Sequence, residues 1–88
     1  MVTTYILFSS NRDKYYIGYT GDLLQERLRR HNSHHKGFTG GNGDWAIVWF
    51  ETYETKLNAM KREREIKNWK SRKKILQLVE KGSDSLGL

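Results

Sequence analysis

The 88-residue sequence contains no cysteine and no long apolar run. The missing cysteine excludes a disulfide framework and a thiolate zinc site. No stretch approaches the roughly 20 apolar residues that a membrane-spanning helix needs, and no signal peptide is apparent. We therefore expect a soluble, cytoplasmic protein that has no membrane partner. A chain of this length forms a single domain, which we place at residues 1–82, followed by a flexible tail at 83–88.

Negative charge is scarce, because 16 lysines and arginines face only 10 aspartates and glutamates, for a formal net charge of +6. Such a surplus suggests a polyanionic partner, above all nucleic acid, and the alternative is a highly charged surface without one. The charge is concentrated in residues 56–74, where nine lysines and arginines face two glutamates. The side chains that we expect to contact nucleic-acid phosphates are Lys14, Arg30, Lys36, Lys61, Arg64, Lys67, Lys70, Arg72, Lys73 and Lys74.

Two segments rich in β-branched and aromatic residues, 2–9 and 14–20, predict a β-hairpin closed by a polar four-residue turn. This turn length places Tyr5 opposite Gly18. Alternation along the strands then places Tyr16 on the same face as both. Glycine inside a strand often marks a close approach of other groups. The pattern fits either a tyrosine-rich core with its phenol groups in water or a site that uses both phenols.

The next segment predicts a helix that begins after Asp22, which we expect to cap it in a capping box with Gln25, and that runs to about Asn32. Arg27 and His31 fall at about 40° and 80° from its first leucine, in the middle of the apolar face. Buried arginine is rare unless it is paired or functional. The alternative is an arginine whose head reaches water and a histidine that is hydrogen-bonded in the core.

A polar, glycine-rich loop spans residues 32–44 and precedes the apolar run Trp45–Phe50. The composition of the run favours a strand that is buried on both faces. Trp45 and Trp49 are expected in the core rather than stacked on bases. The histidines of the loop lack a fourth ligand at a suitable spacing and do not indicate a zinc site.

Residues 55–70 predict a second helix, capped by Thr55 or Thr52. Glu63 falls inside its apolar arc, where a carboxylate is either paired or acts as a ligand or an acid/base group. An ion pair with Arg27 is the structural alternative. A last helix is expected to begin after Ser71 and to end at Gly82.

These residues together resemble the GIY-YIG nuclease superfamily, in particular its short single-domain members related to the nuclease domain of the UvrC excinuclease subunit. The resemblance covers roughly residues 3–78. Tyr5 and Ile6 match the first motif, in which Thr4 replaces glycine, and the second motif is intact at residues 16–18. Arg27, His31 and Glu63 match the family's arginine, a histidine found in many members, and the metal-binding glutamate. An asparagine that some members have after the metal-binding helix has no match here.

The resemblance implies a DNA endonuclease that hydrolyses phosphodiester bonds with one Mg²⁺ or Mn²⁺ ion, in DNA repair or recombination. Its catalytic residues are expected to be Tyr5, Tyr16, Arg27, His31 and Glu63, and Glu63 is the expected metal ligand. Tyr5 is the implied base, which the metal, Arg27 or Lys14 would have to acidify because a phenol has a reference pKa of about 10. A separate targeting protein and the oligomeric state remain open.

We therefore expect an α+β domain of order β-β-α-β-α-α, with a three-stranded antiparallel sheet flanked by helices. The five catalytic residues are expected to converge. The competing function is a non-catalytic nucleic-acid-binding module on the same fold, which would use the basic residues at 56–74. The complete set of tyrosine, arginine and glutamate favours the enzyme, because a pure binding module has no need for Glu63 in an apolar arc.

Overall fold

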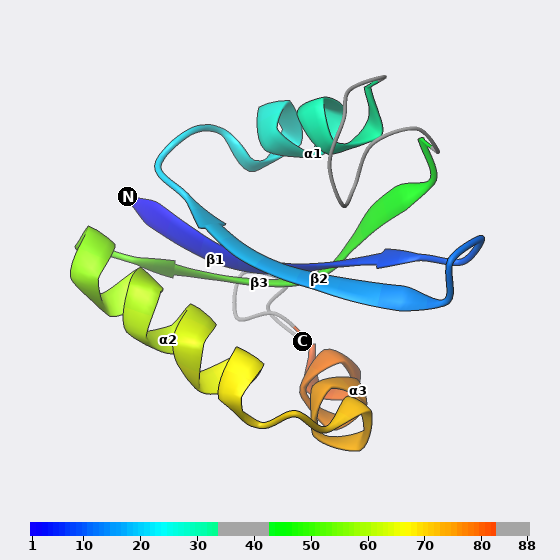
Figure 1. Ribbon diagram of the computed structural model, residues 1–88. Helices are drawn as coiled ribbons and strands as arrows, with labels where there is room; N and C mark the ends of the chain where they lie inside the picture. Colours follow the sequence, from blue (N-terminus) through cyan, green and yellow to red (C-terminus); the bar gives the residue numbers. More distant parts are fainter. Residues whose placement is uncertain (34–42, 83–88) are drawn as a thin grey trace.

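The computed structural model describes residues 1–33 and 43–82 (Figure 1). Its elements are β1 (Val2–Ser9), β2 (Lys14–Thr20), α1 (Leu24–Asn32), β3 (Trp45–Tyr53), α2 (Lys56–Asn68) and α3 (Arg72–Lys81). The predicted α+β class and element order are confirmed. Lys36 and the expected tail at 83–88 lie outside the described residues. No helix in the described part of the chain is long and apolar enough to cross a membrane.

The three strands form one antiparallel sheet of order β2-β1-β3, so β1 lies in the centre. Tyr5 pairs with Gly18, and Leu7 pairs with Tyr16, which confirms the register expected from a four-residue turn. The register matters because it places the glycine of the edge strand directly beside the tyrosine of the central strand.

Helices cover both faces of the sheet, with α1 on one side and with α2 and α3 on the other (Figure 1). Under α1, the core contains the buried Tyr5, Leu7 and Trp45. On the other face, Ile6 and Trp49 pack with Ile66 of α2. Both tryptophans are therefore core residues, as the sequence predicted, with exposed fractions of 3% and 2%.

A β-bulge in β3 explains why the two tryptophans lie on opposite faces. Ile6 pairs with Trp49, whereas the next residue of β1, Leu7, pairs with Ile47, so Val48 is the extra residue. In a regular strand, positions 45, 47 and 49 would share a face. The bulge shifts this alternation. One apolar run thereby supplies both cores.

The capping prediction is correct for α2 and α3 and wrong for α1. The hydroxyl groups of Thr55 and Ser71 accept backbone hydrogen bonds at the starts of α2 and α3. The N-cap of α1 is Leu23, whose side chain cannot accept one, and the predicted box at Asp22 does not form. The Asp22 amide instead donates to the Thr20 hydroxyl, and its carboxylate lies 3.8 Å from Arg30.

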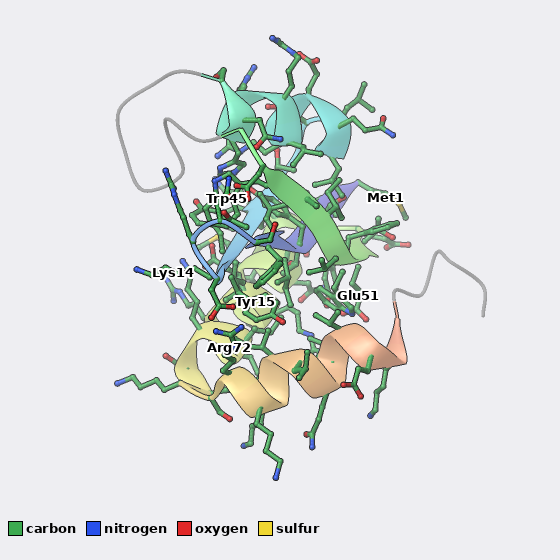
Figure 2. All side chains as sticks on the ribbon, turned by 90° about the vertical axis from the view of Figure 1, so that its right-hand side faces the viewer. Met1, Lys14, Tyr15, Trp45, Glu51 and Arg72 are labelled. Carbon is green, nitrogen blue, oxygen red and sulfur yellow. The ribbon has the colours of Figure 1, made fainter. Side chains whose placement is uncertain are left out.

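Two tethers fix the turn between β1 and β2. The carboxylate of Asp44, just before β3, accepts hydrogen bonds from the Ser9 hydroxyl at 2.6 Å and from the Asn11 amide at 2.8 Å. From α3, Arg72 donates to the Asp13 carboxylate at 2.5 Å and lies over the Tyr15 ring (Figure 2). The turn of the hairpin is thus held by the residue before β3 and by α3.

Candidate active site

A pocket of about 520 Å³ lies along the edge strand β2 and brings together four of the five predicted catalytic residues. Tyr5, Tyr16, Arg27 and Glu63 line it, together with Gly18, Tyr19, Thr20, Gly21, Asp22 and Lys56. They come from β1, β2, α1 and α2, and so from both layers of the fold. The convergence expected from the sequence is present in the geometry.

Gly18 opens the path by which Tyr5 reaches the pocket from the central strand. A Cβ atom at position 18 would lie 2.8 Å from the Tyr5 hydroxyl oxygen, 2.9 Å from Cζ and 3.0 Å from Cε1 of Tyr16. Two of these distances are shorter than any ordinary contact between such atoms. The phenol of Tyr5 therefore occupies the space that any side chain at position 18 would need.

The fifth predicted residue, His31, lies directly behind Tyr5. Its Nε2 atom is 3.1 Å from the Tyr5 hydroxyl oxygen, and its ring is 7% exposed. Arg27 Nε donates to the same oxygen at 3.4 Å. Because a guanidinium can only donate, the Tyr5 oxygen accepts from Arg27, and the phenol can donate its own hydrogen to Nε2 in the tautomer in which that nitrogen carries no hydrogen. The Tyr16 ring packs on His31 with centroids 4.7 Å apart, which fixes the group geometrically.

Burial raises the pKa of Tyr5 above its ordinary value, and the hydrogen bond from Arg27 offsets only part of this effect. The negative charges near it, including Glu63, act in the same direction as burial. Lys14 pairs with Ser9 at the other end of the hairpin and does not line the pocket. Arg27 therefore acts on the Tyr5 pKa in the expected direction, but its effect is smaller than that of burial, and in the protein alone the pKa is above its ordinary value.

Glu63 reaches the pocket from the middle of α2. Lys56 lies seven residues earlier, which is almost two full helical turns, and lines the same pocket. The buried hydroxyl of Thr4 donates to the carbonyl of Ala59, one turn before Glu63, at 2.8 Å. This bond joins α2 to β1 at the residue next to Tyr5.

The ion pair of Glu63 is local to its own helix. Its carboxylate lies 3.5 Å from Lys67 Nζ, and its side chain is 15% exposed. In the described part of the chain, Arg27 bonds to Tyr5 and forms no ion pair with Glu63. The structural alternative of an Arg27–Glu63 pair is therefore absent, and Glu63 keeps an open side toward the pocket.

The carboxylates of residues 1–33 and 43–82 include no cluster of three groups that could hold a metal ion. Glu63 and Asp22 are the pocket's two carboxylates. Mg²⁺ is commonly bound through one or two carboxylates and otherwise through water and phosphate oxygens. The half-buried Glu63, a hard oxygen donor beside an open pocket, fits such a site.

The predicted phosphate-binding residues that the structure describes are distributed over β2, α1, α2 and the start of α3. Lys61, Arg64 and Lys67 are exposed on α2, and Lys70, Lys73 and Lys74 are exposed near the start of α3. Three of the predicted residues are in ion pairs, with Arg30 near Asp22, Lys67 near Glu63, and Arg72 bonded to Asp13. Arg72 is thus used to hold α3 on the hairpin.

Sequence reasoning did not single out Thr4, Tyr19 or Lys56 as parts of the site. The seven-residue spacing between Lys56 and Glu63 would have indicated that they share a helix face. Tyr19 gave no such signal, because alternation places it on the face of the sheet opposite to Tyr16. Thr4 became informative only when its partner on α2 was known.

The fold and pocket define a small α+β domain in which tyrosine, arginine and glutamate side chains converge at a sheet edge. Residues 1–75 match the GIY-YIG catalytic domain, and the chain belongs to the GIY-YIG family. This membership indicates nuclease activity, which is a phosphodiesterase activity with a nucleic acid as its substrate.

The chain is also similar to curated relatives that are named UPF0213 proteins. It is 40% identical over 70 residues to one from Haloquadratum walsbyi, over 78% of this chain and 76% of that protein. It is 40% identical over 67 residues to one from Bacillus pumilus, over 74% of this chain and 66% of the relative. A Staphylococcus saprophyticus relative is 34% identical over 67 residues, over 76% of this chain and 80% of its own. No solved structure matches the chain.

Proposed function

We propose that this chain is a DNA endonuclease that hydrolyses phosphodiester bonds with one divalent metal ion at Glu63. The observation that carries the proposal is the pocket in which Tyr5, Arg27 and Glu63 meet. When bound, Mg²⁺ or Mn²⁺ would offset negative charge on the scissile phosphate and the leaving oxygen. In this proposal, proton transfer and phosphate binding are carried out by side chains of the protein.

The hydrogen-bond order supports a proton relay from water through Tyr5 to His31. One O–H bond of the water breaks as its proton moves to the Tyr5 oxygen, and the phenol's own proton moves to His31 Nε2. The water oxygen forms a new bond to phosphorus while the bond between phosphorus and the leaving oxygen breaks, and the leaving oxygen takes a proton from solvent. This relay avoids a free phenolate, which the burial of Tyr5 disfavours. His31 is thus the final proton acceptor.

Arg27 lies at the edge of the pocket, where its guanidinium can bind phosphate oxygens as a planar fork. Its Nε atom is used to orient the Tyr5 hydroxyl. The two terminal nitrogens of the guanidinium point to the substrate in this proposal. Lys56 adds a second positive charge on the α2 side, so a phosphate would lie between two cations.

Nicking of supercoiled plasmid and of branched DNA tests the proposal, with Mg²⁺, Mn²⁺ or EDTA present. We expect metal-dependent nicking that falls roughly 100- to 1,000-fold in Arg27→Ala, because charge stabilisation in the transition state is lost. Arg29→Ala is the matched control, since Arg29 lies on the same helix, bonds to Glu26 and is 69% exposed.

The non-catalytic binding module is the competing function, and the same experiment separates the two. Salt-sensitive DNA binding without strand scission under any metal condition would contradict the nuclease proposal. Equal loss of nicking in both arginine variants would instead indicate a general charge effect and contradict a specific catalytic function of Arg27.

A further inference from the structure

A second pocket, of about 640 Å³, lies between α2 and α3 and is separate from the catalytic pocket. Its lining includes Arg62 and Trp69 from the second half of α2 and the residue that follows it, and Lys74 and Lys81 from α3. Arg62 and Glu63 are consecutive and line different pockets. The helix α2 is therefore the wall between the two sites.

The aromatic wall of this second pocket packs against Arg62. The Arg62 guanidinium carbon lies 5.7 Å from the Trp49 ring centroid and 5.8 Å from that of Trp69. Arg62 also forms ion pairs with Glu51 at 3.5 Å and Glu65 at 2.5 Å. Glu51 and Glu65 thus offset its charge, while its guanidinium packs on the Trp69 ring.

The positive charge available to a ligand comes from α3. Counted from Arg72, Lys74 and Lys81 fall at about 200° and 180° around the helix, so they share one face. Both are exposed. Glu80, the acidic residue of the lining, falls at about 80° and so lies at the edge of the face that carries the two lysines.

We infer that this pocket binds one nucleotide of an unpaired nucleic-acid segment, with its base against Trp69 and its phosphate between Lys74 and Lys81. Stacking on an aromatic side chain beside a positively charged groove is the general mode by which proteins bind single strands. The volume lies in the range of small-molecule pockets. The inference rests on the proposed nucleic-acid substrate and adds a second contact, across α2 from the reacting phosphate.

Tryptophan fluorescence tests the inference, because Trp45 and Trp49 are 3% and 2% exposed, whereas Trp69 is only partly buried. The full chain is titrated with single-stranded oligothymidylate in EDTA, which removes divalent metal. We expect quenching of the Trp69 emission. The Lys74→Glu/Lys81→Glu variant is expected to bind about tenfold more weakly and to show a smaller dependence of log affinity on log salt, by about 0.7 per lost phosphate contact.

Arg29→Glu is the control, because it makes the same change of charge as Lys74→Glu at an exposed position of α1, which does not line the pocket. We expect it to keep the quenching and to change affinity less than about twofold, since screening weakens distant charges. An equal loss in Arg29→Glu and Lys74→Glu would overturn the inference. Equal quenching by polyglutamate would also overturn it, because the ligand would then be any polyanion.

Plasmid nicking by the same preparations separates this inference from the proposed function. Nicking with Mn²⁺ but no quenching by the oligonucleotide would contradict nucleotide binding at the second pocket and support the nuclease proposal. Quenching that depends on Lys74 and Lys81 without any nicking would support binding at the second pocket and contradict the nuclease proposal. Circular dichroism of each variant verifies that the compared proteins are folded.

Discussion

At the scale of single residues, the proposed catalytic pocket depends on the absence of a side chain at position 18. Tyr5 belongs to the central strand, and its phenol reaches the pocket at the edge strand across a residue that has no side chain. The backbone of Gly18 does not require glycine for its own conformation, because no positive φ is present there. The requirement is the space that the Tyr5 hydroxyl occupies.

Gly18→Ala is therefore expected to displace Tyr5 and to lower plasmid nicking roughly 100-fold, the cost that a misplacement of about 1 Å can have. Gly21→Ala is the control, because Gly21 also lines the pocket but a Cβ there meets nothing within 4 Å. Initial nicking rates of both variants measure the effect. Wild-type nicking by Gly18→Ala would contradict the required position of the Tyr5 phenol.

Thr4 acts through α2 rather than on the substrate. Its exposed fraction is 0%, and its hydroxyl bonds to the Ala59 carbonyl at 2.8 Å. Ala59 lies one turn before Glu63 and Thr4 lies next to Tyr5, so the bond links the helix of the proposed metal ligand to the strand of the phenol. We therefore expect Thr4 to help position Glu63 relative to Tyr5.

We expect Thr4→Val, which keeps the shape and loses the hydrogen bond, to weaken Mn²⁺ binding about tenfold, as loss of a supporting bond behind a metal ligand does. Thr4→Ser keeps the hydroxyl and is expected to restore the affinity. Electron paramagnetic resonance of free Mn²⁺ measures binding without DNA. A Thr4→Val protein that has wild-type Mn²⁺ affinity and a lower Tm would show that the bond is only structural.

The tyrosine, arginine and histidine positions could be predicted from the sequence, because a tight turn fixes strand register and helix periodicity fixes the face of α1. The protonation of Tyr5 could not. From the sequence, Arg27 was a plausible acidifying group, but the pKa depends on how much water burial removes, and here burial outweighs the Arg27 hydrogen bond. This balance exists only in the assembled fold.

At the scale of elements, Asp44 holds the β1–β2 turn against the start of β3. The hydrogen bond from the Ser9 hydroxyl, and then that from the Asn11 amide, lower the pKa of Asp44 below its ordinary value. A carboxyl group with a lowered folded-state pKa stabilises the fold above its unfolded pKa, near 3.9. This stabilisation is lost as the pH falls through the folded-state value.

Asp44→Asn is therefore expected to lower Tm at neutral pH and to make Tm less dependent on pH below about 4, where the wild-type carboxylate takes up its proton. Thermal melts by circular dichroism across this pH range measure both effects. Glu54→Gln, at an exposed position after β3, serves as the control. Parallel Tm curves for the wild type and Asp44→Asn would contradict the linkage.

Element order and most helix ends followed from the sequence, whereas two local features did not. The bulge at Val48 is invisible in a continuous apolar run, because every residue of the run is suited to either face. The start of α1 was misplaced because Asp22 has the composition of an N-cap, yet the Thr20 hydroxyl binds its amide and Arg30 lies near its carboxylate.

At the scale of the whole molecule, the site exists because two layers meet at one sheet edge. Tyr5, Arg27 and His31 belong to the α1 side, and Glu63 comes from α2 on the other side (Figure 1). Neither layer alone contains both the phenol and the proposed metal ligand. We therefore predict that catalysis requires the complete fold. We also predict that no neighbouring side chain can replace Glu63, the proposed metal ligand from α2.

The most direct measurement compares Mn²⁺ binding and plasmid nicking in Glu63→Gln and Glu65→Gln. Glu65 is the matched control, because it lies on the same helix, pairs with Arg62 and is 55% exposed. We predict that Glu63→Gln lowers Mn²⁺ affinity and the nicking rate at least roughly 10- to 100-fold, which is the loss caused by removing a group that only hydrogen-bonds to a metal ligand. Glu65→Gln is expected to keep the wild-type Mn²⁺ affinity and nicking rate. Wild-type Mn²⁺ binding and nicking by Glu63→Gln would contradict the account.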